Sequence, residues 1–358
     1  MSDLHRIDLP GLVGDVPLGF LAVRGLMTQV LESSYLSWDP EDRHAILYCY
    51  KQASGADLVS VLMERLGAIR EGEVLPFTRG FPVRRRRGAP DPLRVTPAGY
   101  RQLARSTDGR SWLEATITDE ATDPDGHCLV NPLIAVRGRQ TIGSFWYYPM
   151  LEVRRDPERL LTEALTGWRG VEGSEGWLLD HNATYSTDPG LRGPGGSMAV
   201  PGATWLATLA VPEFGYPRYG GPHLPKSLPS GWFRVQGAEV FAWPLWTLPA
   251  NGTTTLGSVW SSGWERGHWK FARTSGGGLE ATISQTHGVP APNAIHYIRD
   301  LGIFAMCAAA RPRGGGPLTP VPVRVRRVPS DWGEDPAWEG WDWDFPDPGE
   351  YPGKYGWG

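Results

Sequence analysis

The segment from Gly14 to Trp38 limits the possible folds more than any other part of the sequence. Asp15 is a candidate N-cap, and Pro17 stands near the first helical position, where its missing N–H is not needed. The apolar residues that follow recur at helical spacing, and they are Leu18, Leu21, Ala22, Leu26 and Val30. This pattern predicts a buried, amphipathic first helix.

Composition places the chain among folded globular proteins. It has 358 residues, 41% of them apolar, which is enough for one large core or two modest ones. The three cysteines, Cys49, Cys128 and Cys307, are far apart and odd in number, which argues against a disulfide framework. The sequence shows neither a secretory leader nor an apolar run of about 18 residues, so we expect a cytoplasmic protein without membrane contact.

The order of elements predicts an α+β fold rather than a regularly alternating βαβ sheet. Residues 1–110 are expected to form a mostly helical N-terminal layer with an arginine-rich loop. Residues 111–328 are expected to form an α+β body with a mixed or antiparallel sheet, and 329–358 an extended, acidic tail rich in Trp and Pro. Glycine and proline are frequent throughout, so the fold should be rich in loops.

Some segments carry local predictions of their own. Three helix starts are predicted, at the Ser54/Asp57 capping box, at Thr96-Pro97 and at Asp156-Pro157. Short apolar runs predict strands at 113–117, 128–136 and 142–148. A later apolar segment predicts a helix at 292–306.

An arginine-rich segment is the first candidate for ligand contact. Between residues 79 and 105 a single acid, Asp91, stands against eight arginines: Arg79, Arg84, Arg85, Arg86, Arg87, Arg94, Arg101 and Arg105. Guanidinium groups pair with phosphate oxygens and release counterions, so this segment predicts contact with a nucleic-acid backbone. The alternative is a solvated or protein-facing loop, because arginine replaces lysine almost everywhere in this sequence.

Aromatic residues are the second candidate. The chain has 17 tryptophans, several times what an ordinary globular protein carries. Tyr148, Trp264 and Trp269 have polar neighbours that suggest exposure, so they are the best candidates for stacking on unpaired bases. Most of the other tryptophans are expected in the core.

The C-terminal tail combines eight acids with aromatic residues. We expect its aromatic side chains to dock on a partner protein, and these are Trp332, Trp338, Trp341, Trp343, Phe345 and Trp357. Two alternatives remain: the tail folds back on the arginine loop as an anion mimic, or it is loosely packed with neither role.

Catalytic motifs give little support for an enzyme. The eight histidines are scattered, without metal-ligand spacing, and no phosphate-binding loop or nucleophile elbow is present. We therefore expect no catalytic residue, no metal and no cofactor. An active site assembled from dispersed groups such as Asp180, His181 and His268 stays open as an alternative.

Several ordered motifs resemble one family. The run Pro17-Leu18-Gly19-Phe20-Leu21-Ala22 followed by Leu36-Ser37-Trp38 resembles the opening of proteins from CRISPR type I interference systems of the U or G kind. Later blocks follow in the order that the resemblance requires, and they are Gly176-Trp177 through Asp180, Thr204-Trp205-Leu206-Ala207 and Phe241-Ala242-Trp243-Pro244-Leu245-Trp246. Val16, Arg24 and the spacing from Trp177 to Asp180 depart from that pattern.

The resemblance implies an accessory or large-subunit-like component of a crRNA-guided complex, or a relative of the extension of its helicase-nuclease. Its implied partners are other subunits of that complex and crRNA or target DNA, and it transfers no catalytic residue. The leading hypothesis is thus a non-enzymatic component of a prokaryotic antiviral ribonucleoprotein complex. A protein-only interaction module, an enzyme acting on nucleic acid or nucleotides, and a virion structural protein are the alternatives.

Overall fold

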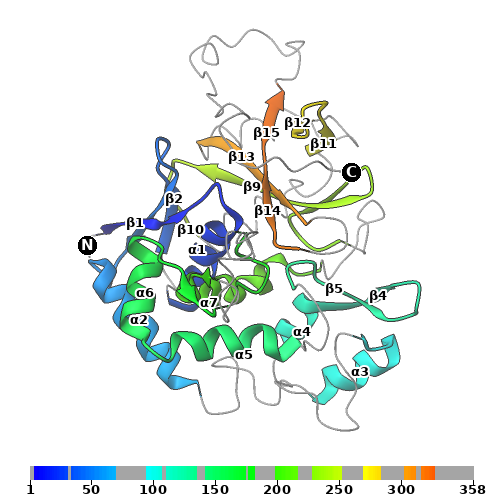
Figure 1. Cartoon of the computed structure of the whole chain (residues 1–358), viewed down its shortest axis with the longest axis horizontal. Helices are drawn as coiled ribbons and strands as arrows, with labels where there is room; N and C mark the ends of the chain where they lie inside the picture. The colour runs from blue at the N-terminus through cyan, green and yellow to red at the C-terminus, as the bar shows by residue number, and fades with distance from the viewer. Residues whose placement is uncertain are drawn as a thin grey trace.

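A computed structural model describes most of the chain. The described residues are 4–30, 34–69, 94–106, 110–134, 142–174, 176–181, 198–216, 228–251, 269–283, 302–311 and 316–326. Within them the chain folds as an α+β protein with several small sheets, as predicted (Figure 1). No helix in these ranges is both long and apolar enough to cross a membrane.

Helices and strands are mixed along the chain. The helices are α1 (Pro17–Val30), α2 (Gly55–Ala68), α3 (Pro97–Ser106), α4 (Arg110–Thr116), α5 (Ile142–Val153), α6 (Pro157–Thr166), α7 (Pro201–Leu209) and the 3-10 helix η3 (Val211–Phe214). The strands up to residue 199 are β1 (His5–Val13), β2 (Ser34–Trp38), β3 (His44–Cys49), β4 (Ile117–Thr122), β5 (Cys128–Val130), β6 (Val171–Glu172) and β7 (Met198–Ala199). The later strands are β8 (Trp232–Val235), β9 (Ala238–Trp246), β10 (Ala250–Asn251), β11 (Trp269–Arg273), β12 (Leu279–Ile283), β13 (Ile303–Ala310), β14 (Thr319–Val321) and β15 (Val323–Arg326).

The N-terminal region contains a sheet that the helical prediction omitted. Its strand order is β1-β3-β2-β10, and all its neighbours pair antiparallel. In β1 the buried Ile7 and Leu9 alternate with the exposed Asp8, which is the period-two pattern of a strand with one buried face. The prediction of a mostly helical layer is therefore incomplete, because α1, α2 and α3 share this region with three strands.

Helix α1 begins at Pro17, as predicted, but from Pro17 to Met27 it is buried on every side rather than amphipathic. Every residue from Pro17 to Met27 is buried. Figure 1 shows α1 and α7 together in the centre of the molecule, between the first sheet and α5. The helices approach so closely at Gly25 that a Cβ there would lie 1.7 Å from the Leu206 carbonyl oxygen. A helix enclosed in this way has no face left for water.

The sheet β14-β13-β9-β8 packs against the same helix and ties the motif blocks together. Trp243 donates its indole N–H to the Gly14 carbonyl at 2.7 Å, and Trp246 donates to the Leu36 carbonyl at 2.7 Å. Phe20 of α1 stacks on Trp243, with ring centroids 5.2 Å apart. These tryptophans are core residues, so segments more than 200 residues apart form one packed unit.

Local helix signals are confirmed at three places. Ser54 Oγ accepts the amide of Asp57, and Asp57 accepts the amide of Ala53, so the capping box at the start of α2 is present. Thr96 Oγ1 accepts the amide of Gly99 at the start of α3. Helix α6 begins at Pro157, although Asp156 makes no cap bond and instead pairs with Arg159.

Three apolar segments have the opposite structure to the predicted one. Residues 113–116 lie in α4 and 142–148 in α5, where strands were expected. Trp146 of α5 is buried and donates to the Thr208 carbonyl of α7, which holds this aromatic segment as a helix. Residues 303–306 begin β13, where a helix was expected. They form a strand because β9 pairs along the whole of β13, and β14 pairs with its alanine-rich second half, Ala308 to Ala310.

The third larger sheet, β11-β12-β15, is mixed: β11 and β12 pair antiparallel, and β12 and β15 pair parallel. Buried apolar side chains from Ile7 to Val323 belong to one cluster, which includes residues from both sides of position 110. Cys49, Cys128 and Cys307 are all buried and unpaired.

Candidate nucleic-acid interface

Helix α3 carries the part of the arginine-rich segment that the structure describes. Tyr100 is buried, whereas Arg101 and Arg105, one helical turn apart, are exposed. Arg94 is also exposed, three residues before the helix begins. Figure 1 shows α3 at the periphery of the molecule, beyond the β4–β5 hairpin. The three arginines therefore meet the first requirement for contact with a large ligand, which is access from solvent.

The Arg101 side chain is 63% exposed and pairs with Asp119 of β4. Its Nε donates to Asp119 Oδ2 at 3.1 Å. An exposed ion pair of this kind contributes about 0.2–1 kcal/mol, so a phosphate can compete with the carboxylate. This contact uses Nε, and a guanidinium has further N–H donors on its two terminal nitrogens, which suit a planar anion such as phosphate.

Tyr148 is the described aromatic candidate, and its predicted exposure is confirmed at 40%. Its ring is parallel to that of Trp177, with centroids 5.7 Å apart and an interplanar angle of 5°. Tyr147 packs edge-on against it at 5.5 Å. Tyr148 is thus held by other rings at the surface, and its stacking on a base stays a prediction.

Many of the predicted contact residues fall outside the described part of the chain. They are Arg79, Arg84, Arg85, Arg86, Arg87, Trp264 and all six aromatic residues of the tail: Trp332, Trp338, Trp341, Trp343, Phe345 and Trp357. Trp269 is described only in its backbone, which pairs with Ile283 at the start of β11. Of the predicted arginines, the structure thus describes Arg94, Arg101 and Arg105, and all three are exposed.

The loop before His181 has a backbone conformation that no sequence signal predicted. Trp177 and Leu178 both have positive φ angles, of 50° and 58°, which is uncommon for residues with large side chains. Arg311 holds this loop by donating to the Leu178 carbonyl at 2.9 Å, and it also binds the Pro132, Leu133 and Gly316 carbonyls. The strained turn presents Trp177 beneath Tyr148.

Asp180 and His181, the pair named for a dispersed active site, follow this turn. Asp180 is 2% exposed, and burial lowers the pKa of His181 below its usual value. The imidazole is therefore neutral at pH 7. His268, the third member, lies outside the described residues.

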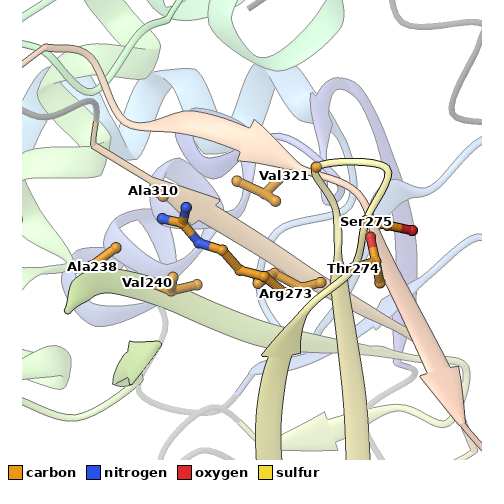
Figure 2. A pocket seen from close by; sticks show the side chains of 9 residues that line it. Ala238, Val240, Arg273, Thr274, Ser275, Ala310 and Val321 are labelled. Atoms are coloured by element: carbon orange, nitrogen blue, oxygen red, sulfur yellow. The ribbon is translucent and has the colours of Figure 1, made fainter. Parts of the chain in front are cut away.

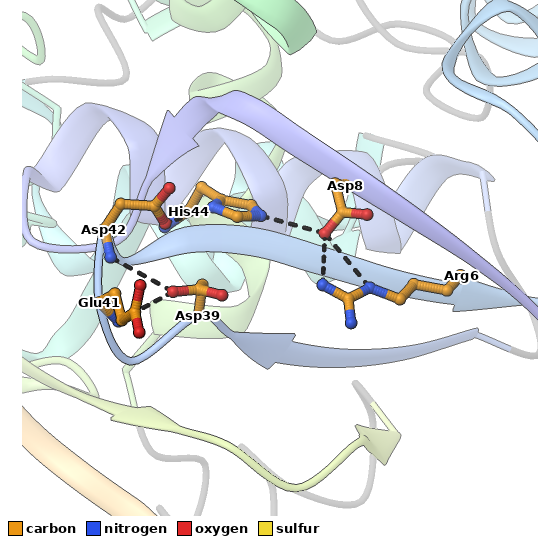
Figure 3. Close-up of polar contacts among 6 residues, drawn as sticks. All are labelled: Arg6, Asp8, Asp39, Glu41, Asp42 and His44. Atoms are coloured by element: carbon orange, nitrogen blue, oxygen red, sulfur yellow. Dashed lines mark hydrogen bonds and ion pairs between the residues drawn. The ribbon is translucent and has the colours of Figure 1, made fainter.

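Among the described residues, two groups of acids and histidines have ligand atoms close enough together to hold a cation. They are Asp39, Asp42 and His44, and Asp123, Asp125 and His127. In the first group Asp39 accepts the amides of Glu41 and Asp42, and His44 bridges Asp42 to Asp8 (Figure 3). In the second, Asp123 accepts the amides of Asp125 and His127. Both groups are explained by tight turns between paired strands.

Three comparisons with known proteins found no relative of this chain. No protein-family model, no curated protein and no solved structure matches the chain.

Proposed function

We propose that this protein is a non-catalytic, cytoplasmic component of a prokaryotic CRISPR-type antiviral ribonucleoprotein complex. The observation that carries the nucleic-acid contact is a basic surface segment in and just before α3, where Arg94, Arg101 and Arg105 are all exposed. In the sequence it directly follows the run Arg84 to Arg87. In this proposal these arginines bind the phosphate backbone, and the acidic aromatic tail docks on a partner subunit.

The assignment to a CRISPR-type system is supported by the ordered sequence motifs. Their residues are those of the central core: Phe20 of α1, Trp38 of β2, Leu206 of α7 and Trp243 of β9. Residues that pack against one another limit each other's size and shape. The presence of these motifs together is therefore evidence that the chain shares a fold with that family, more than that it shares a functional site. The resemblance thus supports membership of a system, and the basic surface supports the role within it.

Salt-dependent binding of RNA and DNA tests the nucleic-acid contact. Each phosphate contact contributes to the slope of log K against log salt, so the double variant Arg101→Gln/Arg105→Gln should reduce that slope by about 1.4 for single strands and about 1.8 for duplex DNA. Fluorescence anisotropy with labelled oligonucleotides over a salt series measures the slope.

Arg159→Gln in α6 is the matched control. Arg159 is also half-exposed and paired with acids, Asp156 and Glu163, but it lies in another helix. It should leave the slope unchanged. Failure of the wild-type protein to retain RNA or DNA at low salt, or an unchanged slope in the double variant, would refute the α3 contact.

Assembly is tested separately by purifying the protein from its native cell with its genomic neighbours and sequencing the bound RNA. The proposal predicts other subunits and crRNA in the preparation, and their loss on deletion of residues 329–358. Recovery of partners without RNA would favour the protein-only module, and recovery of neither would reject the assembly.

A further inference from the structure

The exposed side of helix α5 carries a pair of stacked rings. Tyr148 is 40% exposed, whereas Trp177 beneath it is only 8% exposed. The two ring planes are parallel within 5°, and their centroids are 5.7 Å apart, which is in the range of offset stacking. Tyr147 meets the Tyr148 ring at an interplanar angle of 68° and so does not stack on it. Because Trp177 covers one face, the exposed area of Tyr148 lies on its other face and at its edge.

The lower ring of the pair is held in an unfavourable conformation. Trp177 and Leu178 both have positive φ angles, which residues with large side chains rarely adopt. The indole N–H of Trp177 is buried and has no hydrogen-bond acceptor in the described part of the chain. Backbone strain and unsatisfied buried donors of this kind concentrate at binding sites. A role in supporting the ring above explains the position of Trp177 better than core packing alone.

Contacts on both sides hold this turn in place. On one side the Ser174 hydroxyl donates to the Glu152 carboxylate of α5. On the other side the Leu178 carbonyl accepts an N–H of Arg311 at 2.9 Å and the amide of Leu318 at 2.8 Å. The pair of rings is thus fixed before any ligand arrives, so a third ring can bind with little loss of side-chain entropy.

A cation lies on the same side of the helix. The Arg155 amide donates to the Glu152 carbonyl, so the helical turn continues past the last residue of α5. Arg155 follows Tyr148 by seven positions, which places both on one side of the helix and about 10 Å apart along its axis. Arg155 is exposed, and the neighbouring Asp156 pairs with Arg159 instead. A strand bound over Tyr148 can therefore present a phosphate to Arg155.

The hollow beneath the β11–β12 turn offers no comparable surface. Its volume is about 210 Å³, and its walls include Ala238, Val240, Ala310 and Val321 (Figure 2). The lining that the structure describes contains no aromatic residue. A planar ring therefore has a stacking partner on α5 and none in the described walls of this hollow.

We propose that the outer face of Tyr148 stacks on an unpaired base of a single-stranded nucleic acid, and that Arg155 contacts a phosphate of the same strand. This inference rests on the proposed function and narrows its ligand to an unpaired strand, because bases inside a duplex are covered by their neighbours. Every base has a π-face, so the site accepts any of them. Trp177 is a positioning residue that holds the tyrosine ring.

Fluorescence anisotropy with the full chain over a salt series tests the stacking. The probes are labelled oligouridylate, oligothymidylate, a fully abasic strand of the same length and a blunt DNA duplex. We expect Tyr148→Leu to weaken binding of both base-containing strands about 5- to 150-fold and to remove their advantage over the abasic strand. The loss should be the same at every salt concentration, because stacking releases no counterions. Affinity for the duplex should not change.

Two variants serve as controls for the loss of the ring. Tyr148→Phe keeps a ring on Trp177 and should retain most of the affinity. Tyr50 is also 40% exposed and also contacts a tyrosine, Tyr35, but edge-on, so Tyr50→Leu should change nothing. Arg155→Gln tests the phosphate contact separately and should reduce the salt slope by about 0.7 for single strands. The strand that binds more tightly identifies the ligand as RNA or DNA.

Equal affinity of the wild type for base-containing and abasic strands would overturn the stacking. Equal effects of Tyr148→Leu and Tyr50→Leu, or an equal loss of duplex binding in Tyr148→Leu, would overturn it as well. An unchanged slope in Arg155→Gln would overturn the phosphate contact. If the stacking fails while the α3 arginines still set the salt slope, the proposed function stands, whereas a wild type that binds no strand at all rejects both.

Discussion

At the scale of single residues, Arg24 shows how a departure from a sequence pattern is accommodated. Its guanidinium is fully buried in α1 and binds Glu213 of η3 through two hydrogen bonds, Nε to Oε2 at 2.7 Å and Nη2 to Oε1 at 2.9 Å. A buried charge without a partner would be costly, so Arg24 and Glu213 need each other. The two residues are 189 positions apart in the chain, so no local sequence pattern predicts that they pair.

His44 is the residue for which the structure predicts pH dependence. Burial opposes its protonation, but hydrogen bonds to Asp8 and Asp42 outweigh burial and raise the pKa of the imidazole above its usual value (Figure 3). A raised pKa in the folded state stabilises the fold below the unfolded-state value of about 6.5, and this contribution is lost as the pH rises through the folded-state pKa.

We therefore expect His44→Asn to destabilise the protein more at about pH 5.5 than at about pH 8.5, by at most about 1 kcal/mol. Urea unfolding at the two pH values measures the difference. Asp8→Asn removes one of the two carboxylates and should reduce the same pH dependence. An effect of His44→Asn that is equal at both pH values would show that the contacts do not stabilise the charged imidazole.

At the scale of elements, the contact of α1 with α7 depends on Gly25. The carbonyl of Leu206 occupies the position that a side chain would need. Gly25→Ala gains helix propensity, but the two helices must separate, so we expect a net loss of about 1–3 kcal/mol in the free energy of unfolding.

Gly67 in α2 provides the matched control for that change. A Cβ there would meet nothing within 4 Å, so Gly67→Ala should stabilise the protein by about 0.5–1 kcal/mol. Urea unfolding of both variants gives the comparison. Stabilisation by Gly25→Ala would mean that the two helices are not as close as the structure has them.

Elements also show where local sequence predicts structure well. Helices α2, α3 and α6 begin where caps or Pro predict, because those signals act between residues a few positions apart. The segments that form α5 and β13 have equally apolar sequences without a clear period. Their conformation depends on α7 in one case and on the neighbouring strands β9 and β14 in the other.

At the scale of the whole molecule, one buried cluster includes residues from both sides of the boundary predicted at position 110. We therefore expect a single cooperative thermal transition, with coincident curves from far-UV circular dichroism and tryptophan fluorescence. Gly25→Ala should shift both curves together. Two separate transitions would show that the parts before and after this boundary unfold independently.

The candidate site was predictable only in part. The arginine-rich composition indicated Arg94, Arg101 and Arg105, and polar neighbours indicated that Tyr148 is exposed. The stacking of Tyr148 on Trp177, and the hydrogen bond from Arg311 to the Leu178 carbonyl, join segments far apart in the chain. Local sequence patterns contain no information on such tertiary contacts.

The sequence by itself determined the class of the fold, the starts of several helices and the arginine content of one surface segment, because each depends on composition or on neighbours along the chain. The tertiary structure alone decided that α1 is enclosed, that Arg24 pairs with Glu213, and that Tyr148 stacks on Trp177. These features depend on close packing between distant segments, where the space left by one side chain is defined by all the others.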